Sequence, residues 1–592
     1  MEGHIQRCPP IEQTGIASTV CGPEAFTPDH KPLVGPQPGL RGFWQACGFN
    51  SMGMMLSGGM GEQLATWVAT GAPTIDLFSY DPGRFHESNA KDAVWVKDRT
   101  HESYAKTYSI VFPSDEALAG RGKRTSALYS SLSKAGCVYQ ARHGYERPGW
   151  FLGEGVGTSA LPLSYDYYGA YSGEGTGWRL GEGYADVPKH TENLYNDLIE
   201  GELTFGWPKS FATVAEEVRA AREGCAFFDT SYFGKLMLTG PKADAAMQWM
   251  CSADLDGKEI GSVTYTPLCN AHGGVEADLT VTKVDENSWY LVTGGATMSR
   301  DKRWMLHALE AGGYTAGDVH LNDMSADITL LSVQGPRSHE LLAPLTAGGA
   351  LDDLESFAFS SARDITFANV PNVRCLRLTF VGELGFELHL PASQAANAYE
   401  ALKAAGKQLE RETGAPVRDG GYFAIDSLSA GKSYRHWHAD LGAGDTPMEA
   451  GIGFTTLPKL KRGDEVTFLG QQALHAKHAA GLQRRLVTLV LDDPGGPDGV
   501  APPLHGGEGL LRNGECIGFV RSSAYGHTLG RSIVTGKSAL SINHINTHLP
   551  LTSFLPTPQT QVTSTARREC PRSHRSGYVR GAGPFRASSR SL

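Results

Sequence analysis

The sequence predicts an α+β protein made of several domains, and three observations support this fold class. With 592 residues the chain is too long for a single hydrophobic core. Its hydrophobic fraction of 41% and charged fraction of 20% are ordinary for a globular protein. Segments of alternating hydrophobicity, typical of strands, are mixed along the chain with segments of helical periodicity.

Composition excludes several classes of protein. A formal charge of −10 argues against broad contact with nucleic acid, whose binding depends on neutralising phosphates. The ten Cys residues include no CxxC pair, which argues against a zinc ribbon and fits a reducing compartment. No run of eighteen apolar residues occurs, so we expect no membrane span. The N-terminal segment has neither a signal-peptide nor a transit-peptide pattern.

The first elements that the sequence predicts are a strand and a helix. The segment "GFWQACGFN" is a short apolar strand candidate. The next segment, "SMGMMLSGGMGEQLATWVATG", places Leu64, Trp67 and Val68 at helical spacing, and Gly71 is a helix stop. No GxGxxG turn between a strand and a helix occurs in the chain.

A glycine turn in the segment "YTPLCNAHGGVEADLTVTK" carries the first candidate functional carboxylate. Asp278 follows Gly273-Gly274 and is expected to open the strand "LTVTK". A carboxylate fixed there can accept a hydrogen bond from an amine nitrogen and stabilise a neighbouring cation. Glu276 is expected to face solvent. An Asp that merely serves a turn or a strand end is the competing interpretation.

A second segment, "LRLTFVGELGFELHLP", predicts a hairpin with one buried face. Apolar residues alternate before and after the turn "VGELG", at Leu376, Leu378, Phe380, Phe386, Leu388 and Leu390. Glu387 is expected on the opposite face, and Glu383 lies in the turn. A solvated strand carboxylate is the alternative for Glu387.

The third segment, "AGKSYRHWHADL", contains Tyr434 and Arg435. His436, His438 and Asp440 alternate as metal ligands sometimes do, but no further ligand cluster is evident, so we predict no metal site. Two glycine-rich segments, "GEGVGTSALP" and "SGEGTGWRLGEG", have no strand–turn–helix frame and are expected to be surface loops.

Together these segments resemble a known family. The two glycine-turn segments resemble the folate-binding parts of the glycine-cleavage aminomethyltransferases. The stretches "RHGYERPGWF", "FDTSYFGKLMLTG" and "AIDSLSAGKSYRHWHADL" resemble the mitochondrial sarcosine dehydrogenases, flavoenzymes with a folate domain. The resemblance implies four parts: 1–90, the end of a flavin-dependent amine oxidoreductase domain; 91–150, a linking domain; 151–439, an aminomethyltransferase-like folate-binding domain; and 440–536, a small β-barrel. The remaining residues, 537–592, have little periodicity and are rich in Ser, Thr, Pro and Arg, so we expect a disordered tail.

The resemblance also implies roles for individual residues. Asp278 is the expected catalytic residue, and the expected folate-binding residues are Tyr265, Asp278, Glu383, Glu387, Tyr434 and Arg435. The residues expected near the flavin are Gly48, Asn50, Ser51 and Gly53, where a helix N-terminus would favour an anionic reduced flavin. The chain departs from the family at Gly431-Lys432-Ser433, where the family has Glu-Lys-Gly before Tyr-Arg.

The activity that the resemblance implies is oxidative demethylation of sarcosine to glycine with FAD. Tetrahydrofolate would capture the one-carbon unit as 5,10-methylene-tetrahydrofolate, and an electron-transfer flavoprotein would reoxidise the flavin in the mitochondrial matrix. Three alternatives stay open: a dimethylglycine dehydrogenase, a redox-free aminomethyltransferase, and a folate-binding fragment without catalysis. We expect the chain to start inside the flavin domain. We also expect a gene-model artefact after Gly536, where the resemblance stops.

Overall fold

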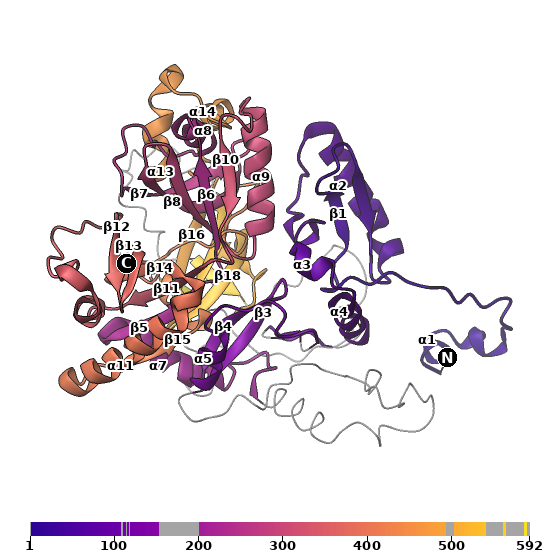
Figure 1. Cartoon of the computed structure of the whole chain (residues 1–592). Helices are drawn as coiled ribbons and strands as arrows, with labels where there is room; N and C mark the ends of the chain where they lie inside the picture. Colours follow the sequence, from indigo (N-terminus) through magenta and orange to yellow (C-terminus); the bar gives the residue numbers. More distant parts are fainter. Residues whose placement is uncertain are drawn as a thin grey trace.

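The computed structural model describes residues 2–107, 110–113, 115–117, 119–152, 201–492, 503–539, 560–563 and 585–588. Figure 1 shows a small N-terminal unit beside a larger body that contains two sheets and a barrel. Within the described ranges, every helix is too short or too polar to cross a bilayer. The glycine-rich segments at 153–162 and 172–183 lie outside the described residues.

The N-terminal unit is a hairpin covered by one long helix. Strands β1 (Leu33–Pro36) and β2 (Trp44–Cys47) pair antiparallel, and α2 (Gly53–Thr70) follows. The helix ends at Gly71, whose φ of 84° closes it with a left-handed residue. The predicted strand and helix are therefore confirmed. Shorter helices precede and follow this unit: α1 (Glu2–Arg7), α3 (Glu87–Ala90) and α4 (Ala93–Ala105).

The first sheet of the body carries the first glycine turn. Its strand order is β10-β6-β9-β8-β7, and all of its pairs are antiparallel. Two helices pack against it through an apolar cluster that contains Met247, Trp289 and Met305. The elements are β6 (Gly234–Thr239), α8 (Ala243–Met250), β7 (Val263–Cys269), β8 (Val275–Asp285), β9 (Ser288–Thr293), α9 (Met298–Ala311) and β10 (His320–Asp323). In Figure 1, α9 lies on the side that faces the N-terminal unit.

The second sheet carries the second glycine turn, in the order β12-β13-β14-β11-β5-β15. A hairpin packs beside it, and its core includes Phe227, Phe386 and Leu388. Its elements and the neighbouring ones are α5 (Tyr129–Lys134), β3 (Cys137–Arg142), β4 (Tyr145–Phe151), α7 (Ser210–Glu223), β5 (Cys225–Asp229), β11 (Ile328–Gln334), α10 (Ser338–Leu342), β12 (Ala362–Phe367), β13 (Val370–Leu376), β14 (Gly385–Pro391), α11 (Ala395–Thr413), β15 (Val417–Gly420) and α12 (Tyr422–Gly431).

The predicted hairpin in this sheet is confirmed only in part. Phe386, Leu388 and Leu390 are buried on β14, as their alternation predicts. The first arm, however, ends at Leu376, so Leu378 and Phe380 belong to the connecting loop. The loop is longer than predicted because β13 pairs with β14 only between Arg374 and Leu376.

A closed barrel forms the C-terminal part of the body. Alternating strands were expected from about Asp440, but they begin at Arg484 because two helices occupy the intervening segment. The alternating segments "LVTLVL" and "CIGFVRSS" lie in β16 and β18. The elements are α13 (Gly453–Leu460), α14 (Gln471–Ala480), β16 (Arg484–Leu491), β17 (Gly509–Arg512), β18 (Glu515–Gly526), β19 (Arg531–Ala539), β20 (Thr560–Thr563) and β21 (Phe585–Ser588). The rest of the tail after residue 539, predicted to be disordered, lies outside the described residues.

Candidate functional site

The glycine turn before β8 is held tightly against the loop that follows the third segment. A side chain on Gly274 would place its Cβ 1.7 Å from the carbonyl oxygen of Ala443, and Gly273 has a φ of 75°. Asn270 closes the turn, because its Oδ1 accepts the Gly274 N–H at 3.0 Å. The Val275 N–H donates to the Asp445 carbonyl at 2.9 Å. The two glycines are therefore required by close approach and by backbone conformation.

Asp278 lies inside β8 rather than at its start, because the strand begins three residues earlier, at Val275. The Tyr265 hydroxyl of β7 donates to Asp278 Oδ2 at 2.6 Å. Since Tyr265 pairs with Thr280, the two side chains are diagonal neighbours on one face of the sheet. Burial raises the pKa of the Asp278 carboxyl, and the Tyr265 bond and the nearby His436 oppose that rise. The structure thus joins two of the predicted site residues directly.

The third segment packs against the same turn. The Trp437 indole N–H donates to the Val275 carbonyl at 2.8 Å. The neighbouring Arg435 donates to Thr488 Oγ1 of β16 at 2.8 Å, which ties the segment to the barrel. Burial raises the pKa of Tyr265, and the positive charge of Arg435 partly opposes this effect. The ionisation of Tyr265 therefore depends on both Asp278 and Arg435.

Glu387 lies in a separate group of polar side chains between the two sheets. Its Oε2 is 3.5 Å from Nε2 of His389, and the Nδ1 of that histidine is 3.0 Å from the Tyr290 hydroxyl. Burial lowers the pKa of His389, which favours the neutral ring. Within the described residues, the buried Nε2 makes no hydrogen bond. The arrangement favours the tautomer in which Tyr290 donates to Nδ1 and the Nε2–H is directed toward the Glu387 carboxylate.

Glu383 and Tyr434 line an open cavity of about 330 Å³ in the loop after β13. The Glu383 carboxylate accepts from Arg222 Nη1 at 2.7 Å, so part of its hydrogen-bonding capacity is used by the protein. The Tyr434 ring stacks on Phe380 with a centroid distance of 5.9 Å. Among the hydrogen bonds and ion pairs of the described residues, none joins Asp278 to Glu387.

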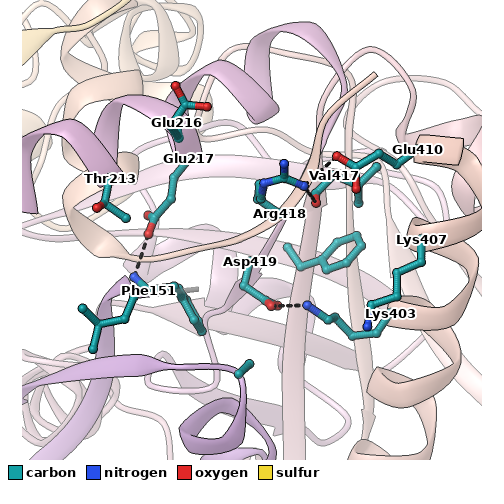
Figure 2. A pocket seen from close by; sticks show the side chains of 13 residues that line it. Phe151, Thr213, Glu216, Glu217, Lys403, Lys407, Glu410, Val417, Arg418 and Asp419 are labelled. Atoms are coloured by element: carbon teal, nitrogen blue, oxygen red, sulfur yellow. Dashed lines mark hydrogen bonds and ion pairs between the residues drawn. The ribbon is translucent and has the colours of Figure 1, made fainter. Parts of the chain in front are cut away.

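Another cavity of about 330 Å³ contains none of the predicted site residues. Figure 2 shows its lining between α7, α11 and β15. Its polar groups bond to the protein itself: Glu217 accepts the Phe151 N–H at 2.8 Å, and Lys403 donates to Asp419 at 2.5 Å. These contacts stabilise packing between elements.

Sequence reasoning was wrong about Glu276 and missed its partner. Glu276 was expected to face solvent, but its side chain is only 13% exposed. Its carboxylate bonds to the Arg300 guanidinium and to Asn270 Nδ2. Arg300 comes from α9, and hydrophobic periodicity carries no signal for such a distant contact. His389, Tyr290 and Trp437 were missed for the same reason. Among the described residues, no three His, Cys, Asp or Glu side chains gather as a metal site would require.

The residues predicted to face the flavin occupy the entry to α2. Asn50 is buried, and its Oδ1 accepts the Thr27 N–H at 2.8 Å. The Ser51 hydroxyl bonds to Glu24. The first turn of α2 has no side-chain cap, which leaves its N–H groups available to an anionic partner. Gly48 has a φ of 64°, and Gly53 is the first residue of the helix.

Comparisons with known proteins agree with this architecture. The model "GCVT N-terminal domain" matches residues 128–459, "FAD dependent oxidoreductase central domain" matches 70–126, and "Glycine cleavage T-protein C-terminal barrel domain" matches 484–548. A crystal structure of the glycine cleavage aminomethyltransferase T from Bartonella henselae has a TM-score of 0.55 and 19% identity. It covers 79% of this chain and 97% of that one, which shows a shared fold.

Two curated relatives define the similarity more closely. The mitochondrial sarcosine dehydrogenase of Homo sapiens is 43% identical over 90% of this chain and 55% of its own length. The chain thus spans about half the length of that relative. An aminomethyltransferase from Symbiobacterium thermophilum is 32% identical over 55% of this chain and 82% of its own length. The predicted resemblance to sarcosine dehydrogenases is confirmed, and the chain belongs to the glycine cleavage T-protein family.

Proposed function

We propose that this chain supplies the folate-dependent half of a sarcosine dehydrogenase reaction. In the proposed reaction, tetrahydrofolate captures the one-carbon unit removed from sarcosine and leaves as 5,10-methylene-tetrahydrofolate. The observation that carries the proposal is the Tyr265–Asp278 hydrogen bond behind a locked glycine turn, in a chain 43% identical to human sarcosine dehydrogenase. The identity extends beyond the matched T-protein domains, which favours this function over a redox-free aminomethyltransferase.

The proposed chemistry at Asp278 is orientation and charge stabilisation. Removal of hydride from the methyl group of sarcosine leaves the iminium CH2=NH⁺–CH2–COO⁻. An amine nitrogen of tetrahydrofolate attacks the CH2 carbon, and a second nitrogen then closes the ring and displaces the amine of glycine. Asp278 accepts a hydrogen bond from the attacking nitrogen and offsets the developing positive charge. Tyr265 holds one carboxylate oxygen, so the other stays available to the folate.

The remaining predicted residues are proposed to bind the folate. Glu387 would accept two N–H groups from the amino-pyrimidine edge of the pterin. Tyr434, which lines the open cavity, would contact the ring system or the linker, and Arg435 would contact the glutamate tail. Glu383 is a weaker candidate because its carboxylate is already paired with the Arg222 guanidinium.

The redox partners and location are inferred from the relatives. FAD would accept the hydride, and Gly48, Gly53 and the uncapped start of α2 would form one wall of its site. Asn50 and Ser51 would shape that wall, since their side chains bond within the unit. An electron-transfer flavoprotein would reoxidise the flavin, and the setting would be the mitochondrial matrix; the name of the human relative places that protein in mitochondria.

Calorimetry with tetrahydrofolate tests the proposal. Glu387→Gln removes charge from an acceptor and should weaken binding by about 1.5–3 kcal/mol, the scale of a hydrogen bond to a charged group. Asp278→Asn keeps the shape but removes the charge, so it should weaken folate binding and slow formation of methylene-tetrahydrofolate. Glu410→Gln, on the surface of α11, is the matched control. Unchanged binding in Glu387→Gln would refute the pterin placement, and full-rate capture in Asp278→Asn would refute the catalytic role.

A further inference from the structure

Arg300 of α9 holds the first residues of β8, the strand that contains Asp278. Its Nη1 donates to the Glu276 carbonyl at 2.6 Å, and its Nη2 bonds to the Glu276 carboxylate. Its guanidinium lies 4.8 Å from the Trp437 ring centroid, and Trp437 donates to the Val275 carbonyl. Two consecutive backbone carbonyls, at Val275 and Glu276, are therefore fixed by one connected group of side chains.

On its other side, this group of side chains contacts the segment that follows the N-terminal unit. Phe78 packs edge-on against Trp437 at a centroid distance of 4.8 Å, and Arg300 lies 5.6 Å from the Phe78 ring. Asp81 is paired with Arg303 at 2.8 Å and lies 4.0 Å from Arg300. Segment 76–81 thus docks on α9 and on the third segment at once, in the region where Figure 1 places the N-terminal unit next to α9.

Each charged side chain in this contact depends on its partners to compensate for its burial. The side chains of Arg300, Glu276 and Asp81 are 14%, 13% and 13% exposed. Asp301 is also buried, and its Oδ1, 3.7 Å from Arg300, has no hydrogen bond. Burial opposes the charge of Arg300, but these three carboxylates raise its pKa overall. Such a group has one well-defined arrangement, because moving any member leaves a buried charge without compensation.

We infer that Arg300 is a positioning residue that couples the docking of segment 76–81 to the placement of Asp278. The clamped carbonyls precede Asp278 by two and three residues in the same strand, so loosening them displaces the carboxylate relative to Tyr265. The segment lies within residues 70–126, which match the FAD dependent oxidoreductase central domain, and it contacts the folate-type domain through Trp437 and Arg300. The inference rests on the proposed function where it assigns a consequence for folate, but the mechanical coupling does not depend on it.

Hydrogen exchange of a peptide covering residues 270–282 tests the coupling without any ligand. Phe78→Ala removes a docking contact without touching the turn, and Arg300→Met removes the clamp. Both should speed exchange of this peptide by about tenfold, through local opening. Arg121→Met breaks a comparably buried ion pair with Glu146, elsewhere in the chain, and should leave the peptide unchanged. Slow, wild-type exchange in Phe78→Ala would overturn the inference, even if Arg300→Met fails to fold.

A double mutant and a binding assay separate positioning from simple stability. In the Arg300→Met background, Phe78→Ala should speed hydrogen exchange of this peptide by less than about twofold, because the contact through Arg300 is already lost. With tetrahydrofolate, Phe78→Ala should weaken binding roughly three- to tenfold, in the range of coupling through packed networks. If exchange responds but folate affinity does not, the coupling stops short of Asp278 and the positioning role is wrong. If wild type binds no tetrahydrofolate, the proposed function fails, and the exchange data still decide the coupling.

Discussion

Replacing Tyr265 with Phe removes one hydroxyl group and isolates the central contact of the site. The lost bond, 2.6 Å from Tyr265 Oη to Asp278 Oδ2, has an ionised acceptor. Hydrogen bonds to charged groups contribute about 1.5–3 kcal/mol, which corresponds to a factor of about 10–150 in an equilibrium constant. Phe also keeps the ring, so packing around Val275 and Trp437 is preserved. The perturbation is therefore electrostatic, and its sign can be worked out.

The expected effect is a shift in the pH dependence of tetrahydrofolate binding. Burial already raises the pKa of Asp278, and the Tyr265 bond opposes this rise. An acid is charged above its pKa and loses its charge as the pH falls through that value. Tyr265→Phe removes an opposing effect, raises the pKa further and so moves the acidic loss of binding to higher pH. On the acidic side, affinity should drop by about 10–150-fold relative to wild type, while the plateau at high pH changes less.

A matched control exists in the same chain. The Tyr399 hydroxyl donates to Asp419 Oδ1 at 2.8 Å, in a buried Tyr–Asp pair of the second sheet. Tyr399→Phe should lower stability without moving the pH profile of binding. Isothermal titration calorimetry from pH 5 to 9 compares the three proteins. If the affinity of Tyr265→Phe falls at the same acidic pH as that of wild type, the assignment of Asp278 as the titrating group is refuted.

Three further predictions concern the frame of the site. Gly274→Ala should cost about 3 kcal/mol of stability, the upper end of overpacking, because its Cβ meets the Ala443 carbonyl; Gly444→Ala, which has open space, is the control in a urea titration, and equal midpoints would contradict the close approach. Tyr290→Phe should let the His389 ring change tautomer, visible as altered 15N shifts of the ring, and weaken folate binding; unchanged shifts would exclude the proposed tautomer. Burial lowers the pKa of Lys459 to about 8, so the protonated form costs about 3 kcal/mol below that pH and the cost disappears toward pH 10.5; the stability of wild type relative to Lys459→Met should rise over this window, and a flat difference would contradict the shift.

The sequence was most informative where a local pattern determines a structure. The period of α2 and its Gly71 stop, and the alternation of Phe386, Leu388 and Leu390, depend on neighbours in the chain, and each is present as predicted. Leu378 and Phe380 also alternate but lie in a loop, because pairing with a partner strand, rather than alternation, decides where β13 ends. The resemblance predicted both Tyr265 and Asp278 for the site, but it did not predict the hydrogen bond between them. The contact of Glu276 could not be predicted, because its partner Arg300 lies on a helix that approaches only in the folded chain.

The two candidate carboxylates have different surroundings, and the difference fits the division of labour proposed for them. Asp278 receives one short hydrogen bond, to Oδ2, and burial raises its pKa. A carboxylate held in this way is poorly solvated and gains most when a cation forms beside it, which is the requirement for stabilising an iminium. Glu387 instead faces a neutral His389 ring that Tyr290 orients from the other side. Beside such a fixed neutral ring, the Glu387 carboxylate keeps a defined orientation without becoming more reactive. A defined orientation is what recognition of two N–H donors in one plane requires. In the proposed function, a carboxylate would thus serve catalysis on β8, as Asp278, and recognition on β14, as Glu387, through the groups that each strand places around it.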